Sequence, residues 1–391
     1  MGRVSKNDII EKFKQEFTAQ FQDDIFTISI APGRINLIGE HTDYNLGMAI
    51  PIAINRWICS IISLRSDDKI NIYASNFKDT ISLNINNLNV DKTGWQEYVL
   101  GCINIFTKRY NINKGFNILI GGNIPIGFGM SSSAALEVSL LGALISAFEN
   151  PINNNEILKL SNKVEQEYLG IQSGFLDQYA SIFSKNNQPL LIDFSTLSHT
   201  YINSNIKGAS WILINSMVDR SLIDSKYNDR VAECQSALDY INISNNDKIE
   251  INQMTYDHLK KLKACDDNNL MYKRISHVLS ENQRVQLMHQ ALEKGDLNLI
   301  GNILNQSHDS LANNYEVSCL EIDAIISISR KQKGFYGGRI MGGGFGGCTL
   351  SLVDDFHRES FVNNIVEGFY DDFKYEVKVE PVEFSDGFEV R

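Results

Sequence analysis

The stretch IPIGFGMSSSAALE, residues 124–137, combines two glycines, three serines and a run of helix-forming residues. The alternating segment before it, residues 116–120, is typical of a strand. The pattern therefore predicts a strand, a glycine-rich turn and a helix that begins near the serines, which are favoured N-caps. Such a helix N-terminus favours an anion, because its free N–H groups and its dipole both attract negative charge. A nucleotide phosphate fits this description.

The loop lacks two features of other phosphate loops. No Gly-Lys-Ser/Thr follows the spacer, so no lysine is placed to reach the terminal phosphates, and the third glycine of a dinucleotide fingerprint is missing. Taken alone, such a stretch is more often a capped turn than a phosphate site. The choice between the two depends on the rest of the chain.

The composition excludes several classes of protein. The chain has 391 residues, 43% of them hydrophobic, and a formal net charge of −11. The length predicts about two to three domains, and the acidic balance argues against a nucleic-acid or anionic-membrane surface. The six cysteines include no C-x-x-C pair, and the seven histidines show no metal-ligand spacing. Since no apolar run reaches the length of a membrane span, we expect a cytoplasmic protein with free thiols.

A second unusual segment, residues 31–45, has the sequence APGRINLIGEHTDYN. Its charged and titratable residues include Arg34, Glu40, His41 and Asp43, and they alternate with isoleucines and a leucine that favour burial. A solvated loop would explain the charges but not the apolar residues between them. Polar groups beside an apolar floor suit sugar recognition, because carboxylates and imidazole bond hydroxyls in fixed geometry.

Three further segments carry residues of interest. Trp95 and Tyr98 lie one turn apart on a predicted helix, where aromatic residues are more often core than ligand contacts. Asp177 stands between apolar residues, where an unpaired carboxylate is costly. It is either a helix N-cap or a catalytic carboxylate paired with a cation. Residues 337–347 hold seven glycines, a density that implies backbone packed against backbone or ligand.

The remaining chain mixes predicted strands and helices. A division is placed in the polar turn material at 195–208, which separates an N-terminal domain, residues 1–205, from a C-terminal domain, residues 206–391. Strands are expected at 26–30, 49–54, 58–64, 69–74, 81–85, 190–194, 211–215 and 349–353, and helices at 5–22, 95–110, 132–148, 155–168, from 225 onward and over much of 243–312.

Three of these segments together resemble the galactokinases of the GHMP small-molecule kinase superfamily. Residues 32–45 are similar to the galactokinase signature, residues 125–134 to the superfamily's phosphate loop, and residues 339–348 to its third motif. The resemblance implies an α+β fold of two domains, the first like ribosomal protein S5 domain 2 and the second ferredoxin-like, with the active site in the cleft between them. It implies phosphorylation of the C1 hydroxyl of α-D-galactose by ATP with Mg²⁺, the first committed step of galactose metabolism by the Leloir pathway.

The resemblance also implies roles for single residues. Asp177 matches the catalytic carboxylate, and Arg34 lies beside it to keep it ionised and to stabilise charge in the transition state. Ser133 and Glu165 match the pair that holds Mg²⁺. The implied galactose contacts are Glu40, His41, Thr42, Asp43, Gly174 and Tyr227, and the implied ATP contacts are Gly127, Phe128, Gly129, Met130, Ser131, Ser132 and Ser133, with Trp95 and Tyr98 near the adenine.

Few positions depart from the family pattern. Met130 replaces a usual leucine, a volume-conserving change, and Met341 stands where threonine is common before three glycines. Two alternatives stay open: a kinase for another sugar, such as N-acetylgalactosamine or arabinose, and an inactive sensor that binds galactose and ATP. The presence of Arg34, Ser133 and Asp177 favours an active enzyme. Galactose and ATP are the expected partners, and a monomer is expected.

Overall fold

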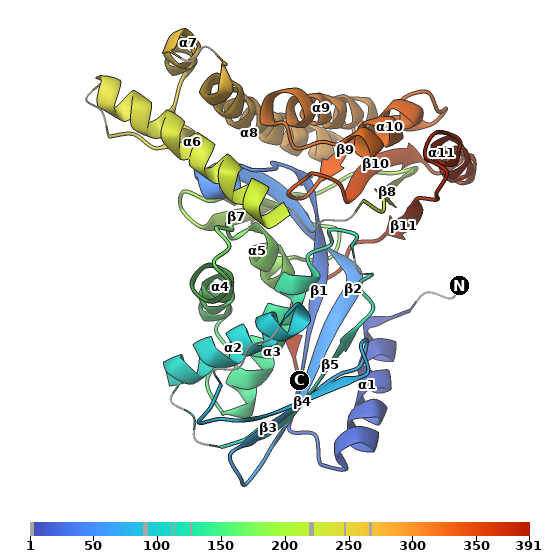
Figure 1. Ribbon diagram of the computed structural model, residues 1–391. Coiled ribbons are helices and arrows are strands. Elements are labelled where there is room, and N and C mark those ends of the chain that lie inside the picture. Colours follow the sequence, from blue (N-terminus) through green and yellow to red (C-terminus); the bar gives the residue numbers. More distant parts are fainter. Residues whose placement is uncertain are drawn as a thin grey trace.

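The computed structural model describes residues 4–88, 93–110, 112, 114–125, 127–218, 223–245, 248–265 and 268–391, without the side chains of residues 223–226. Over these ranges the chain forms two β-sheets, each packed against helices, with one sheet above the other in Figure 1. The α+β fold predicted from the sequence is confirmed.

The first sheet lies in the lower half of Figure 1, and its described strands follow the order β12-β1-β2-β5-β3-β4, with β6 paired to β2 and β7 paired to β6. Paired strands are antiparallel except β3 and β5. The strands are β1 (Thr27–Ile38), β2 (Met48–Leu64), β3 (Lys69–Ala74), β4 (Asp79–Asn84), β5 (Phe116–Gly122), β6 (Leu190–Asp193), β7 (Ser198–Tyr201) and β12 (Glu389–Val390).

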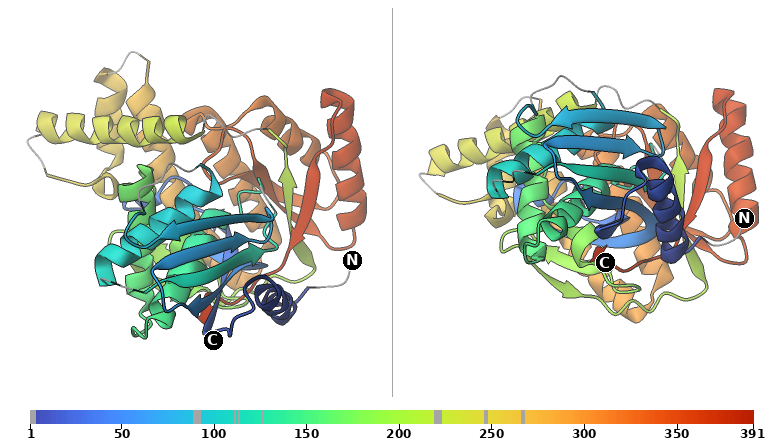
Figure 2. Two further views of the ribbon diagram at one scale, coloured as in Figure 1. Left: turned by 60° about the horizontal axis from the view of Figure 1, so that its bottom comes forward. Right: turned by 90° about the horizontal axis from the view of Figure 1, so that it is seen from below.

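Helices cover both faces of this sheet. Helix α1 (Lys6–Phe21) packs on one face through apolar residues such as Phe13 and Phe17, and Figure 2 shows it alone on that side. The opposite face carries α2 (Trp95–Tyr110), α3 (Ser132–Ala147), α4 (Asn154–Lys163) and α5 (Leu176–Phe183). Helix α3 is buried nearly all round, as its apolar sequence predicts.

The second sheet is antiparallel, and its strands lie in the order β11-β8-β10-β9. Numbered along the chain within this sheet, the order is 4-1-3-2, which is the ferredoxin-like arrangement. Its strands are β8 (Ala209–Asn215), β9 (Phe335–Met341), β10 (Cys348–Asp354) and β11 (Lys378–Val382). The helices of this half are α6 (Ile223–Asn245), α7 (Tyr256–Cys265), α8 (Leu270–Lys294), α9 (Leu297–Ser310), α10 (Leu320–Ser329) and α11 (Arg358–Phe373). Short turns are η1 (Asp43–Asn45), η3 (Ile251–Gln253) and the π-helical η2 (Val164–Leu169) and η4 (Leu311–Tyr315).

One apolar core joins the two halves. It combines Ile35 and Leu37 of β1, Met130 of the phosphate loop, and Met288 of α8 with residues of the second sheet such as Met341. The second sheet also packs tightly on α9, since a Cβ atom on Gly337 would lie 1.9 Å from the Gly301 carbonyl oxygen. The dense glycines of 337–347 therefore do press backbone against backbone, as predicted.

Several elements differ from those expected, and strands β9 and β11 and helices α10 and α11 have no predicted counterpart. The two strands expected at 49–54 and 58–64 are one continuous strand, β2, because β1 pairs along both parts. The segment 195–208, expected as turn material, contains strand β7. The C-terminal segment returns to the first sheet, where β12 pairs with β1. The division at 205/206 stays a prediction. Among the described helices, none is long and apolar enough to cross a membrane.

Candidate active site

A cavity lies where the two halves meet. Its wall comes from β1, the turn that follows β1, α2, η2, α5, α6 and the glycine-rich segment after β9. The lining residues are Arg34, Glu40, His41, Asp43, Tyr98, Glu165, Ile171, Ser173, Gly174, Leu176, Asp177, Gln178, Tyr227, Gly342 and Gly343. Segments far apart in the sequence are thus brought together around one space.

Arg34 and Asp177 form an ion pair at this wall. The Arg34 Nε and Nη2 atoms each lie 2.6 Å from Asp177 Oδ1, and Arg34 Nη1 donates to the Gly129 carbonyl oxygen at 2.7 Å. The Ser131 hydroxyl donates to the other carboxylate oxygen of Asp177. Asp177 lies in the first turn of α5 but makes no N-cap bond there, so the cation-paired alternative is the one that the structure supports.

The phosphate loop rests directly on β1. The Arg34 N–H donates to the Met130 carbonyl oxygen at 3.0 Å, and a Cβ atom on Gly33 would lie 2.5 Å from that oxygen. Glycine at position 33 therefore allows the loop to approach the strand. Gly127 and Gly129 have φ of 85° and 64°, which glycine adopts without strain. Ile126, within the predicted loop, lies outside the described residues.

The serines do not cap α3 as expected. Ser131 occupies the N-cap position with φ of 54° and makes no side-chain cap bond. Its hydroxyl is instead directed to Asp177, since the left-handed backbone turns the side chain away from the first turn. Ser132 and Ser133 open the helix, and neither they nor the loop residues 127–130 line the cavity.

The turn after β1 presents Glu40, His41 and Asp43 to the cavity. Glu40 Oε1 accepts bonds from Arg339 Nη1 and from the Gly342 N–H, both at 2.9 Å. Thr42, predicted as a galactose contact, does not line the cavity, because its hydroxyl donates to two backbone carbonyl groups of the same turn region, at 2.9 and 2.8 Å. Thr42 thus shapes the turn rather than its inner wall.

Burial sets the charges of this wall. Burial, with the neighbouring carboxylates of Asp177 and Glu40, raises the pKa of Asp43 to about 7. Burial lowers the pKa of His41 to about 3, helped by His277 and Arg230. His41 is therefore neutral at physiological pH. Its Nε2 atom is buried and has no hydrogen-bond partner among the described residues.

Aromatic rings support His41 from behind. His41 Nδ1 lies 2.8 Å from the Tyr44 hydroxyl, which lies 2.9 Å from that of Tyr315. The Tyr227 ring centroid lies 5.6 Å from that of His41, so Tyr227 reaches the cavity from α6. Burial, with Asp43 second, raises the pKa of Tyr227 well above its ordinary value, and its hydroxyl stays protonated.

Glu165 lies in the π-helical turn η2, a geometry that is frequent at functional sites. Its carboxylate accepts a bond from the Ser173 hydroxyl, and burial raises its pKa to about 7. No group of three or more His, Cys, Asp or Glu side chains suited to a metal ion is found in the described part of the chain. A metal ion bound by Glu165 would therefore need ligands of other kinds, such as a serine hydroxyl or phosphate oxygens.

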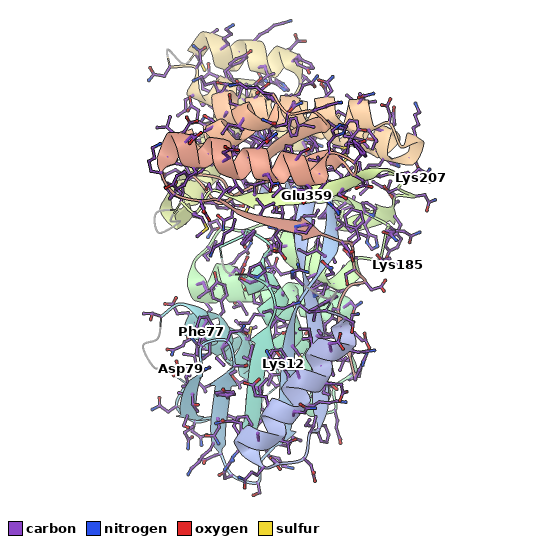
Figure 3. All side chains as sticks on the ribbon, turned by 90° about the vertical axis from the view of Figure 1, so that its right-hand side faces the viewer. Lys12, Phe77, Asp79, Lys185, Lys207 and Glu359 are labelled. Carbon is purple, nitrogen blue, oxygen red and sulfur yellow. The ribbon has the colours of Figure 1, made fainter. Side chains whose placement is uncertain are left out.

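Of the two aromatic residues predicted to lie near the adenine, one lines the cavity and the other does not. Tyr98 lines the cavity. Trp95 stacks on Phe77 instead, with ring centroids 5.6 Å apart and planes 8° from parallel. Figure 3 shows Phe77 near Asp79 at the edge of the lower half, where half of its side chain is exposed.

Several wall residues escape sequence reasoning. Gln178 follows Asp177 and donates to the buried Glu137 at 3.0 Å. Ser173 binds Glu165, and Gly342 with Gly343 closes the cavity from the second half. The sequence signal for these residues was their position alone, either next to Asp177 or within the glycine-rich segment. The apolar lining residues Ile171 and Leu176 carried none.

Comparison with known families agrees with this geometry. The galactokinase galactose-binding signature matches residues 11–64, which include Arg34 and the turn from Glu40 to Asp43. The GHMP kinases N terminal domain matches residues 97–185, and the GHMP kinases C terminal domain matches residues 288–371. Galactokinase of Clostridium beijerinckii is 36% identical over 382 residues, which cover 97% of this chain and 98% of that protein.

The chain belongs to the galactokinase family. Galactokinase of Ligilactobacillus salivarius is 36% identical over 394 residues, covering 99% of this chain and all of that protein. The crystal structure of Lactococcus lactis galactokinase complexed with galactose superposes with a TM-score of 0.91 at 31% identity, covering 97% of this chain and 99% of that one. A mevalonate kinase with a TM-score of 0.65 and 20% identity shares the fold. Membership in the galactokinase family makes the chain an enzyme, a small-molecule kinase that uses ATP.

Proposed function

We propose that the enzyme transfers the γ-phosphoryl group of ATP to the C1 hydroxyl of α-D-galactose. The observation that carries this proposal is the Arg34–Asp177 pair, which lies in one cavity wall with Glu40, His41 and Asp43. The match of the galactose-binding signature to this segment and the galactose complex of the Lactococcus lactis relative support galactose as the sugar.

The part of the cavity wall that is proposed to bind galactose offers both hydrogen-bond acceptors and a hydrogen-bond donor. The carboxylates of Glu40 and Asp43 can accept bonds from sugar hydroxyls, and neutral His41 has an unpartnered Nε2 atom for one more. The Tyr227 hydroxyl and the backbone at Gly174 complete the proposed galactose site. Thr42 contributes indirectly, through the shape of the turn.

Asp177 is proposed to take the proton of the C1 hydroxyl or to orient that hydroxyl. The C1 oxygen then forms a bond to the γ-phosphorus, and the bond from that phosphorus to the β,γ-bridging oxygen breaks, giving galactose 1-phosphate and ADP. The proton of the C1 hydroxyl passes to Asp177 and then to solvent. Arg34 lies 2.6 Å from Asp177 and is placed to stabilise the charge that develops during transfer.

The ATP phosphates are proposed to lie on the loop 127–133 at the N-terminus of α3. Because the net charge is −11, positive potential must come from the loop N–H groups, the helix dipole, Arg34 and a metal ion. The oxygen ligands of Ser133 and Glu165 suit Mg²⁺, which usually takes few protein ligands together with phosphates and waters. Bound Mg²⁺ would neutralise phosphate charge. Trp95 and Tyr98 are proposed to lie near the adenine.

We further propose that the enzyme acts as a monomer in the cytoplasm. The spacing of the six cysteines, without a C-x-x-C pair, supports a reducing compartment. Sedimentation of the purified chain tests the monomer, which a concentration-dependent larger species would refute.

The deciding experiment measures ADP release with Mg-ATP and a panel of sugars that includes galactose, N-acetylgalactosamine and arabinose. Galactose is expected to be the best substrate. Asp177→Asn is expected to lower kcat by about 10²–10⁴-fold while galactose still binds, because the amide keeps the shape but cannot take a proton. Turnover of another sugar alone would refute galactose as the substrate. Binding of galactose and ATP without turnover would refute the kinase and support the sensor.

A further inference from the structure

The turn after β1, which carries Glu40, His41 and Asp43, is called the galactose turn below. Charged groups from the second half of the chain bond its outer side. Glu281 of α8 and Arg339 of β9 are fully buried, and both bond the segment that carries Glu40 and His41. Neither belongs to the cavity wall. Two buried carboxylates, Glu40 and Glu281, therefore face two buried guanidinium groups, Arg284 and Arg339, so the charges of the cluster balance.

Glu281 bonds the backbone of the turn itself. Its Oε1 atom accepts from the Gly39 N–H at 3.0 Å, from the Glu40 N–H at 3.3 Å and from the Ser307 hydroxyl at 2.8 Å. Its Oε2 atom accepts from Arg284 Nε at 2.6 Å. All of these donors are buried, so the carboxylate satisfies N–H groups that water does not reach.

Two neighbours fix the rest of the turn. His277, one helical turn before Glu281, lies with Nε2 3.1 Å from the Glu40 carbonyl oxygen. Because that oxygen can only accept, Nε2 carries the proton, and Nδ1 of the neutral ring accepts from Ser310. Arg339 donates to the backbone carbonyl oxygens of Asn36 and Leu37 and to the Glu40 side chain.

The turn needs such support because its backbone is unusual. His41 has a φ of 61° and Gly39 a φ of 96°. A non-glycine residue in the left-handed region is strained, and surrounding contacts must maintain it. Burial alone would raise the pKa of Glu281, but Arg284, His277 and Arg339 outweigh it and lower that pKa to about 2, so the supporting carboxylate is charged at every working pH.

We propose that Glu281 is a positioning residue for sugar recognition, which holds the Gly39–Glu40 backbone so that the side chains of Glu40 and His41 meet the sugar hydroxyls. The residue touches neither sugar nor ATP in this role. The proposal rests on the proposed function, since it names what fixes the galactose-binding turn.

Glu281→Gln is the sharpest test. An amide has one acceptor and one donor end, so its NH₂ group must face either Arg284 or the Gly39 N–H, and both are donors. We expect the galactose KM and the galactose Kd from calorimetry to rise at least about tenfold. The KM for ATP and kcat at saturating galactose are expected to stay near wild type, because Asp177, Arg34 and the phosphate loop lie elsewhere.

Glu316→Gln is the matched control. Glu316 is also a carboxylate paired with a buried arginine of α8, Arg274 at 2.8 Å, but it bonds no part of the galactose turn. It is expected to leave galactose affinity unchanged. If Glu281→Gln folds and keeps the wild-type galactose KM and Kd, the positioning role is refuted. It is equally refuted if galactose and ATP affinity fall together with the melting temperature, as a purely structural role predicts.

Two further measurements keep the outcome clear. If Glu281→Gln fails to fold, Ser307→Ala removes one donor to the same carboxylate without a change of charge and is expected to raise the galactose Kd by a smaller factor; no rise would refute the proposal. A wild-type chain that binds galactose but does not phosphorylate it would refute the proposed function alone, because the variant Kd still tests Glu281. A wild-type chain that does not bind galactose would refute both.

Discussion

The galactose turn and the phosphate loop are built in opposite ways. The turn at Glu40–Asp43 is bonded from behind by buried charged groups of the second half, among them Glu281 and Arg339. The proposed phosphate loop is bonded by the proposed catalytic pair itself, since Arg34 donates to Gly129 and Asp177 accepts from Ser131. If these roles hold, the geometry of the sugar site is fixed by distant residues, whereas the geometries of the loop and of the Arg34–Asp177 pair are coupled. Changes behind the turn should alter galactose affinity, and changes in the loop should alter phosphoryl transfer.

Arg34→Lys should give the largest effect, because Arg34 belongs to the coupled side. Lysine keeps the charge but cannot bond Asp177 twice and Gly129 at the same time. We expect kcat to fall by about 10²–10³-fold, measured by steady-state kinetics with both substrates saturating. Arg65→Lys is the control, since Arg65 makes a similar two-bond contact to Asp67 at the surface. A kcat near wild type for Arg34→Lys would break the proposed coupling.

A pair of glycine substitutions separates the two regions. A Cβ atom on Gly174 would lie 2.0 Å from Asp43 Oδ2, so Gly174→Ala must displace Asp43 and should raise the galactose KM at least about tenfold. A Cβ atom on Gly127 would make only an ordinary contact, 3.5 Å from Asn215 Nδ2, but the residue has a φ of 85°. Gly127→Ala therefore strains the loop by about 1–2 kcal/mol and should raise the ATP KM. If each variant changed both KM values equally, the two regions would not be separate.

Ser131→Ala should have a smaller effect on transfer. It removes one hydroxyl donor to Asp177, a loss of about 1 kcal/mol, so we expect kcat to fall by about fivefold with the galactose KM unchanged. Single-turnover measurements would separate transfer from product release. A rise in the ATP KM with an unchanged kcat would show that Ser131 serves the nucleotide alone.

The smallest expected effect is the pH dependence of galactose binding. The pKa of Asp43 is about 7 and that of His41 about 3, so Asp43 is the group of the turn that titrates near neutrality. If the carboxylate form binds sugar, the galactose KM should fall about threefold as pH rises from about 6.5 to 7.5. Asp43→Asn should abolish this dependence, and an identical pH profile in that variant would assign it to another group.

The same raised pKa has a consequence for stability. Between about pH 4 and pH 7 the folded chain keeps a proton on Asp43 that the unfolded chain has lost. The contribution of Asp43 to the free energy of unfolding therefore decreases as pH rises through this window. Chemical denaturation of wild type and Asp43→Asn at both ends of the window would measure this contribution.

Local sequence patterns were sufficient for most elements. Helices α1, α2 and α3 begin and end within about two residues of their expected bounds, because their apolar periodicity and flanking turns are strong signals. Strand β2 was expected in two pieces, since the polar residues Asn55 and Arg56 interrupt its apolar run. Pairing with β1 along both parts overrides that local signal. Strands β7, β9, β11 and β12 and helices α10 and α11 were not expected.

The cavity wall was predictable where motifs were dense and unpredictable where support comes from afar. Arg34, Glu40, His41, Asp43 and Asp177 all meet in one cavity, as the motifs suggested. Glu281, on a polar helix, could not be distinguished in the sequence from a solvated residue, because only the fold shows which helix face is buried. Ser131 was expected as an N-cap, and its bond to Asp177 depends on a left-handed backbone that the sequence does not specify.

The return of the C-terminal segment to the first sheet bears on how the enzyme is made. The backbone N–H groups of Gly387 and Phe388 donate to the carbonyl oxygens of Ser184 and Ser181, at the end of the helix that carries Asp177. During translation these bonds cannot form until the second half has left the ribosome. We expect helix α5, which carries Asp177, to reach its final packing only after the segment that contains Gly387 and Phe388 has been synthesised.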